Sequence, residues 1–152
     1  MTAWLSDDEQ RVWRAYLRST ELLQAALDAQ LQREAGIPHT YYVVLAMLSE
    51  APDRTLRMSE LASKANASPS RLSHAFGKLE ERGWVTRRRS PGDGRGTLAT
   101  LTDAGLDFLV EHAPGHVDAV RRGLFDHLTP EQVQQLVCAL GSVVDGLERG
   151  GT

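Results

Sequence analysis

The segment 59–82 constrains the fold of this 152-residue chain more than any other part of it. Residues 59–64 predict a short helix, which a tight turn separates from a second helix. Ser68 is a favourable N-cap for that second helix, and Pro69 follows at the first helical position, where a missing N–H costs nothing. Two helices joined in this way are typical of a helix-turn-helix.

The hydrophobic period changes directly after this segment, at Gly83. Residues 84–89 and 97–101 predict two short strands, and the segment between them, 90–96, is rich in glycine and contains a proline, as hairpin tips are. Alternation along the first strand places Arg88 on the face opposite its two arginine neighbours. The pattern therefore predicts a basic hairpin next to the second helix.

Helical segments flank this middle region. Ser6 and Glu9 have the spacing of a capping box, which predicts a long first helix. We expect a bend at 114–115, where proline and glycine interrupt the fifth helix. The six expected helices run from Ser6 to about Gly36, over 41–49, 59–64 and 68–82, from Thr102 toward His127, and from Thr129 to Gly150.

The charge is distributed unevenly along the chain. The net charge is −3, but residues 54–101 carry ten Lys or Arg and four Asp or Glu, a balance of +6, so the rest carries −9. A basic middle between acidic ends is typical of a polyanion-binding module on an acidic frame. The acidic N-terminus does not resemble a signal peptide, and we expect a cytoplasmic protein with no membrane span.

The second helix of the helix-turn-helix has two different faces when its residues are projected at helical spacing. Leu72, Phe76 and Leu79 form the apolar face. In a helix-turn-helix the other face enters the major groove, where Arg, Lys and Ser side chains contact bases or phosphates. A solvated face is the alternative. The residues predicted to contact DNA from this helix are Ser68, Ser70, Arg71, His74 and Lys78.

The hairpin provides a second basic element. A glycine-rich tip with one arginine, Arg95, suits the minor groove, where the negative potential attracts a guanidinium. A solvated hairpin is the alternative. Arg88, Asp93 and Arg95 complete the predicted DNA-binding set.

Several segments together resemble the MarR family of transcriptional regulators. They are Met58–Ala62, Ser68–Val85, the Asp-x-Arg of residues 93–95, and the Leu-Thr-x-x-Gly of residues 101–105. The resemblance implies a mainly α winged helix-turn-helix with six helices and a two- to three-stranded wing sheet. It also implies an intertwined homodimer, joined through the first, fifth and sixth helices on a pseudo-palindromic operator, with Arg95 in the minor groove and Asp93 orienting it. Pro69 departs from the family, which usually has a polar residue there.

This resemblance divides the chain into a dimerisation region, residues 1–40 and 102–152, and a DNA-binding region, residues 41–101. It implies a repressor of adjacent genes that a small phenolic or anionic ligand releases from DNA. The candidate ligand-binding residues are Trp13, Tyr16, His39 and Tyr42. Core packing is the alternative role for these four residues.

We expect no cofactor and no enzymatic activity, because no glycine-rich cofactor motif and no nucleophile–base pair is evident.

Two other functions are also compatible with the sequence. One is a zinc-responsive regulator of the same fold, because His112 and His116 are spaced to share a helix face, with Glu111, and with His39 or Asp28, as further ligands. Pro114 and Gly115 lie between the two histidines, and a solvated pair is the alternative. The other is a winged-helix module that binds an acidic protein partner instead of DNA.

Overall fold

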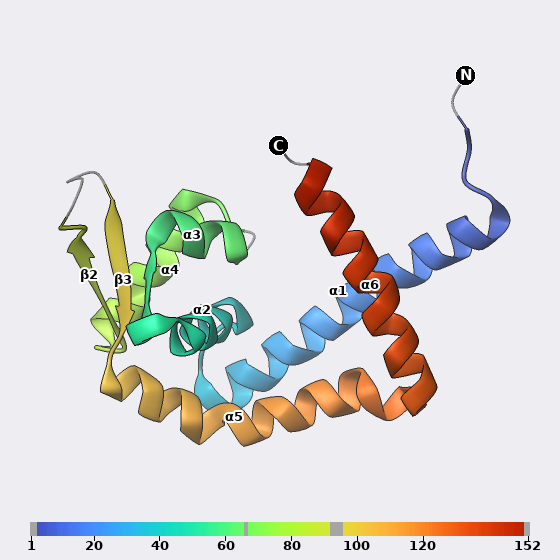
Figure 1. Ribbon diagram of the computed structural model, residues 1–152. Coiled ribbons are helices and arrows are strands. Elements are labelled where there is room, and N and C mark those ends of the chain that lie inside the picture. The colour runs from blue at the N-terminus through green and yellow to red at the C-terminus, as the bar shows by residue number, and fades with distance from the viewer. Residues whose placement is uncertain (1–2, 66, 92–95, 151–152) are drawn as a thin grey trace. The chain divides into compact units, whose positions relative to one another are not determined.

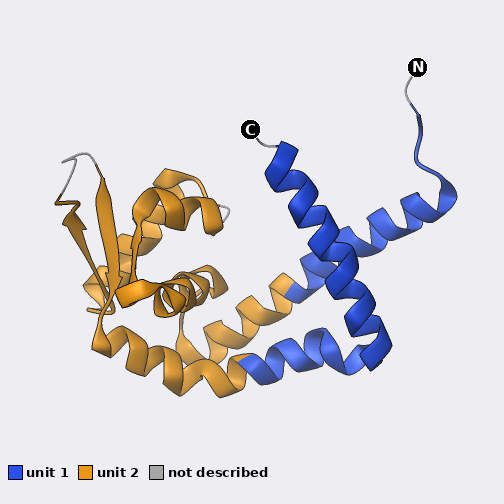
Figure 2. Ribbon diagram, in the orientation of Figure 1, with its two compact units in different colours: residues 1–23, 117–152 blue, residues 24–116 orange. Residues whose placement is uncertain are grey.

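The computed structural model describes residues 3–65, 67–91 and 96–150. It has two compact units, Met1–Leu23 with Val117–Thr152 and Gln24–His116 (Figure 2). The first and fifth helices each contribute residues to both units. The functional division at residues 40/41 and 101/102 stays a prediction, because compactness does not test it.

Six α-helices are present in the described ranges, as the sequence predicts, together with three strands and two short 3-10 helices (Figure 1). Both termini of the second helix extend beyond the expected 41–49. The elements are α1 (Asp7–Ala35), α2 (His39–Glu50), η1 (Pro52–Arg54), β1 (Thr55–Arg57), α3 (Met58–Lys64), α4 (Pro69–Glu81), β2 (Val85–Arg89), β3 (Thr97–Leu101), α5 (Asp103–Gly123), η2 (Phe125–His127) and α6 (Pro130–Gly150).

Local hydrogen bonds explain where these helices begin and end. Ser6 N donates to Glu9 Oε2 at 2.7 Å, and Glu9 N donates to Ser6 Oγ at 3.3 Å, which confirms the capping box before α1. Thr129 and Gln132 make the same reciprocal pair before α6, at 2.9 and 3.3 Å. At the other end of α1, Gly36 has φ +65°, a left-handed conformation that glycine adopts without strain.

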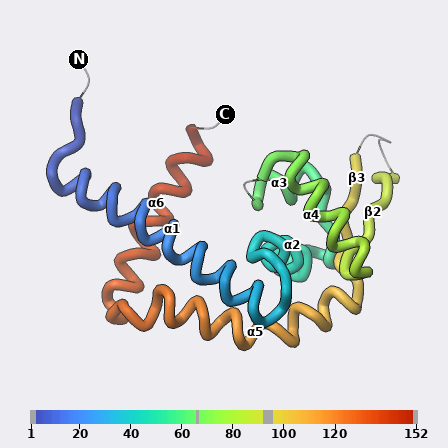
Figure 3. Tube along the Cα trace, turned by 180° about the vertical axis from the view of Figure 1, so that it is seen from behind, coloured from blue at the N-terminus to red at the C-terminus, as the bar shows by residue number. Residues whose placement is uncertain are grey.

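The three strands form one antiparallel sheet in the order β1–β3–β2. Leu56 of β1 pairs with Ala99 of β3, and Arg87 of β2 pairs with the same Ala99 from the other side. The family resemblance allowed for a third strand, but residues 55–57 alone gave no strand signal, because a three-residue segment is too short to show alternation. Helices α2, α3 and α4 lie beside this sheet (Figures 1 and 3), and all of them belong to the unit Gln24–His116.

The core of the unit Gln24–His116 is a single apolar cluster. Phe76 and Leu79 of α4 are fully buried, which confirms the apolar face predicted for that helix. Burial of such side chains is the main stabilising term for this unit. The other large side chains that are fully buried come from α1, α2, α3, β2 and the α1–α2 loop: Leu31, Leu45, Leu48, Leu61, Val85 and Ile37.

The other unit, Met1–Leu23 with Val117–Thr152, has no buried residue among those that the structure describes. Cys138 lies in an apolar stretch of α6 and is exposed, because the apolar face of α6 is uncovered in the single chain. No helix in the described ranges combines the length and apolar character needed to cross a membrane.

Candidate nucleic-acid interface

The start of α4 is fixed by its own sequence. Ser68 lies in an extended conformation, and its Oγ accepts a hydrogen bond from Arg71 N at 3.2 Å. Pro69 occupies the first helical position. The Ser68 hydroxyl, predicted to contact DNA, therefore also caps the helix that would carry the other contacts.

The polar face of α4 is exposed, as its sequence predicts. Ser70, Arg71 and His74 are all exposed, opposite the buried apolar face. Lys78 is exposed as well and forms an ion pair with Glu81, whose Oε2 lies 3.1 Å from Lys78 Nζ. Within the described part of the chain, the Arg71 guanidinium has no acidic partner. Arg71 is therefore the cation on this face whose charge is not already compensated.

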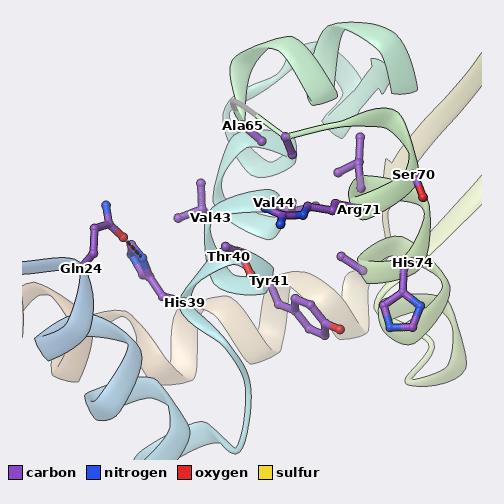
Figure 4. A pocket seen from close by; sticks show the side chains of 13 residues that line it. Gln24, His39, Thr40, Tyr41, Val43, Val44, Ala65, Ser70, Arg71 and His74 are labelled. Carbon is purple, nitrogen blue, oxygen red and sulfur yellow. Dashed lines mark hydrogen bonds between the residues drawn. The ribbon is translucent and has the colours of Figure 1, made fainter. Parts of the chain in front are cut away.

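A pocket of about 590 Å³ lies between α2 and α4, and Gln24 of α1 also lines it (Figure 4). Arg71 extends from α4 toward α2 in this pocket. The walls combine apolar side chains with a few polar groups, a composition typical of small-molecule sites. Thirteen residues line it: Gln24, His39, Thr40, Tyr41, Val43, Val44, Ala65, Ala67, Ser70, Arg71, Leu72, His74 and Ala75.

Of the four predicted ligand-binding residues, the structure places only His39 among those that line this pocket. Its Nδ1 lies 3.0 Å from Gln24 Oε1 (Figure 4). Tyr42, in the same unit, is 6% exposed and does not line the pocket. Trp13 and Tyr16 belong to the other compact unit, where their rings stack with centroids 6.5 Å apart and both side chains are exposed.

His39 also belongs to a cluster of aromatic side chains with His116 and Tyr42. The ring centroid of His116 lies 5.4 Å from that of His39 and 4.4 Å from that of Tyr42. Burial lowers the pKa of His39, although Asp28 opposes this effect, and burial together with nearby His39 lowers the pKa of His116. Burial raises the pKa of Tyr42. The cluster is therefore neutral near pH 7.

The hairpin carries its arginines on opposite faces, as alternation predicts. Arg87 points to α4, where its Nη2 lies 2.6 Å from Glu80 Oε2. Arg88, the next residue, is exposed and has no ionic partner among the described residues. Asp93 and Arg95, the predicted contacts at the tip, lie outside the described residues.

Comparisons with known proteins agree with this architecture. A sequence model of the MarR family matches residues 35–96. Sco3205, a MarR family transcriptional regulator from Streptomyces coelicolor solved in complex with DNA, is 52% identical, with 97% of this chain and 92% of that chain covered and a TM-score of 0.89. The chain belongs to the MarR family.

Two further relatives support membership of the MarR family. AbsC, a MarR family transcriptional regulator from Streptomyces coelicolor, is 39% identical, with 97% of this chain and 99% of that chain covered and a TM-score of 0.87. The HTH-type transcriptional repressor Rv2887 of Mycobacterium tuberculosis is 32% identical over 131 residues, which are 86% of this chain and 91% of the relative.

The histidine pair considered as a zinc site in this MarR family chain is separated by its contacts. His112 Nδ1 lies 2.9 Å from the Phe108 carbonyl oxygen, and its ring contacts the Phe108 ring. His116 instead contacts His39 and Tyr42. In residues 3–65, 67–91 and 96–150, no group of three or more His, Cys, Asp or Glu is placed to hold a metal ion.

The residues that sequence reasoning missed share one property: their partners lie on other helices or strands, which a local sequence pattern does not reveal. The pocket joins Gln24 and Thr40 to α4, and no local pattern marks those positions. Arg87 is seven residues from Glu80 and on a different element, so a strand pattern shows which face Arg87 occupies but not its partner. The basic run was the available signal, since alternation places Arg87 and Arg88 on opposite faces of the strand.

Proposed function

We propose that this chain is a homodimeric, sequence-specific DNA-binding repressor. One observation carries the proposal: a helix with a well-formed cap presents Ser70, Arg71 and His74 to solvent beside a basic hairpin, in a member of the MarR family. The 52% identical relative Sco3205 was solved in complex with DNA. Because its relatives are named transcriptional regulators and repressors, we place the chain in the cytoplasm and infer no enzymatic activity.

In this proposal α4 enters the major groove. Arg71 is the residue we expect to recognise a guanine edge or a phosphate, with Ser70 and His74 beside it. Arg88 contacts the backbone from the hairpin, and Arg95 reaches the minor groove with Asp93 orienting it. Lys78 adds a phosphate contact if DNA displaces Glu81 from its ion pair.

A dimer follows from the uncovered apolar side chains of the unit Met1–Leu23 with Val117–Thr152. Trp13, Val137 and Val144 are more than half exposed. Exposed apolar surfaces of this kind on soluble proteins mark interfaces with other proteins. A two-fold dimer would place two α4 helices about one DNA turn apart, so the operator would be pseudo-palindromic.

We further propose that a small anionic or phenolic ligand releases the repressor. The pocket and the DNA-reading face share Arg71 and His74, so an occupant of the pocket competes with DNA for the same groups. A carboxylate would pair with the Arg71 guanidinium, and a compact apolar body would pack on Val43 and Val44. The pocket volume, about 590 Å³, suits such a molecule.

The DNA-binding proposal is tested by selecting duplexes from a random pool with the wild-type protein. We expect a palindrome, bound with an affinity that falls steeply as salt rises. Arg71→Ala should weaken binding about tenfold or more. Arg122→Ala, which removes the same charge from the other unit, is the matched control and should have a much smaller effect. If no sequence is selected, or if Arg71→Ala binds like wild type, the proposal is wrong, and a module that binds an acidic protein becomes the better hypothesis.

The ligand proposal is tested with benzoate and 4-hydroxybenzoate, and with uncharged benzyl alcohol as the control. We expect the carboxylates to release the selected duplex and to raise the unfolding midpoint of DNA-free protein, while benzyl alcohol does neither. Arg71→Ala should lose the rise in unfolding midpoint. Equal shifts in the variant and the wild type would show that Arg71 does not hold the ligand.

A further inference from the structure

Arg87 of β2 directs its whole guanidinium toward α4. Its Nε and Nη2 donate to the same Glu80 oxygen, Oε2, at 2.9 and 2.6 Å. Its Nη1 donates to Ser73 Oγ at 3.4 Å. The guanidinium carbon lies 5.6 Å from the centre of the Phe76 ring. All three contacted residues belong to α4, the proposed recognition helix.

This ion pair is more enclosed than its neighbour on the same helix. The side chains of Arg87 and Glu80 are 33% and 30% exposed, whereas those of Lys78 and Glu81 are 50% and 67% exposed. Partly shielded charges attract each other more strongly than exposed ones, because water and salt screen them less. The Arg87–Glu80 pair is therefore suited to hold β2 in a fixed orientation against α4.

Arg87 lies on β2 of the hairpin and Glu80 lies on α4, and both the hairpin and α4 are proposed to contact DNA. Arg87 pairs with Ala99 in the register of β2 and β3, so it lies within the strands that support the hairpin tip. Arg88 lies on the opposite face of β2 with no ionic partner among the described residues. Adjacent arginines in one basic run thus have different surroundings.

We propose that Arg87 is a positioning residue and not a DNA contact: through Glu80 it fixes the hairpin against α4, so that both elements meet the duplex in one geometry. This inference rests on the proposed DNA-binding function. It assigns the phosphate contact of the run to Arg88. It also gives Glu80 a role that its charge alone would not suggest.

The role of Glu80 can be tested by whether its removal strengthens or weakens DNA binding. A carboxylate near a polyanion normally opposes binding, so its removal should strengthen binding. If Arg87 contacted DNA, Glu80→Gln would also free its guanidinium, which would strengthen binding further. If Arg87 positions the hairpin, Glu80→Gln weakens binding instead, because the hairpin loses its fixed orientation.

The experiment measures affinity for the duplex that the wild-type protein selects from a random pool. We expect Glu80→Gln and Arg87→Gln each to weaken binding about tenfold, and the double variant to be no weaker than either, since the two residues act as a unit. The control, Glu81→Gln, removes the adjacent carboxylate and should leave binding unchanged or tighter. The charge exchange Glu80→Arg with Arg87→Glu should recover most of the affinity.

A hydroxyl-radical footprint separates positioning from general destabilisation. In Glu80→Gln we expect protection by the hairpin at the operator flanks to disappear, while protection by α4 in the half-sites persists. Uniform loss of protection with a lower unfolding midpoint would overturn the proposal, as would tighter binding by Glu80→Gln. A wild-type protein that selects no sequence would overturn the proposed function as well, and this result is visible before any variant is made.

Discussion

Gly105 shows how closely one residue can be constrained in this fold. Thr102 Oγ1 accepts a hydrogen bond from Gly105 N at 3.1 Å, and Thr102 N donates to the Trp84 carbonyl oxygen at 3.0 Å. These bonds hold the first turn of α5 against the start of β2. A Cβ at position 105 would overlap the Trp84 carbonyl oxygen and the Leu101 side chain. Backbone oxygen cannot move aside as a flexible side chain can.

We therefore expect Gly105→Ala to destabilise the protein by about 1–3 kcal/mol or more. The matched control is Gly77→Ala in α4, where a Cβ would meet nothing within 4 Å. That substitution should stabilise the protein by about 0.8–1 kcal/mol, because alanine favours helix. Urea unfolding at fixed protein concentration measures both changes. Equal effects at the two positions would show that the close approach at 105 is not what constrains it.

At the scale of elements, the end of α1, α2 and the first part of α5 meet around two histidines. His39 of α2 and His116 of α5 are in ring contact, and His116 Nδ1 is a buried atom without a hydrogen-bond partner. Asp28 of α1 accepts a hydrogen bond from His39 N at 2.9 Å, and it is the acidic group that favours protonation of His39. Because both histidines have lowered pKa values, this junction is most stable when they are neutral.

The sign of the pH dependence follows directly. The unfolded chain binds protons at the ordinary histidine pKa, while the folded chain binds them only at lower pH. The free energy of unfolding is therefore highest above a pH of about 6.5 and falls as the pH drops below that value. Urea unfolding at several pH values measures this loss, and His116→Gln should reduce it. If His116→Gln shows the same pH dependence as wild type, protonation of His116 does not cause the loss of stability at low pH.

Elements with local signals could be predicted from the sequence, and elements that depend on distant partners could not. The caps at Ser6, Ser68 and Thr129 act over three residues, so α1, α4 and α6 were predicted with nearly correct starts. Strand β1 has three residues and is defined by its pairing with β3, which no local pattern reveals. The pocket and the contacts of Arg87 depend on tertiary packing in the same way.

At the scale of the whole molecule, the described chain leaves apolar surface uncovered on α6. No residue of this helix is buried. Its apolar residues recur every three or four positions, so they lie along one stripe. A helix with such a stripe gains most of its stability by packing on a partner. The exposed apolar side chains of α6 are Leu136, Val137, Leu140, Val143, Val144 and Leu147.

We expect wild-type protein to sediment as a dimer at micromolar concentration. Leu140→Glu and Val144→Glu place a charge on this stripe and should each shift the equilibrium toward monomer, because a buried unpaired charge costs several kcal/mol. Gln135→Glu, on the opposite side of the helix, is the control and should remain dimeric. Sedimentation velocity measures all four proteins. A monomeric wild type would contradict the role given to the stripe.

The Arg87–Glu80 pair also limits how this protein can be redesigned. An engineer who wishes to change the operator would transplant the exposed residues of α4 from a relative and leave the strands untouched. Ser73 and Glu80 reach the surface of that helix and both contact Arg87, so we expect such a graft to change how the hairpin is held unless these two residues are retained. A change of operator specificity should therefore treat α4 and β2 together, with the contacts between them kept unchanged.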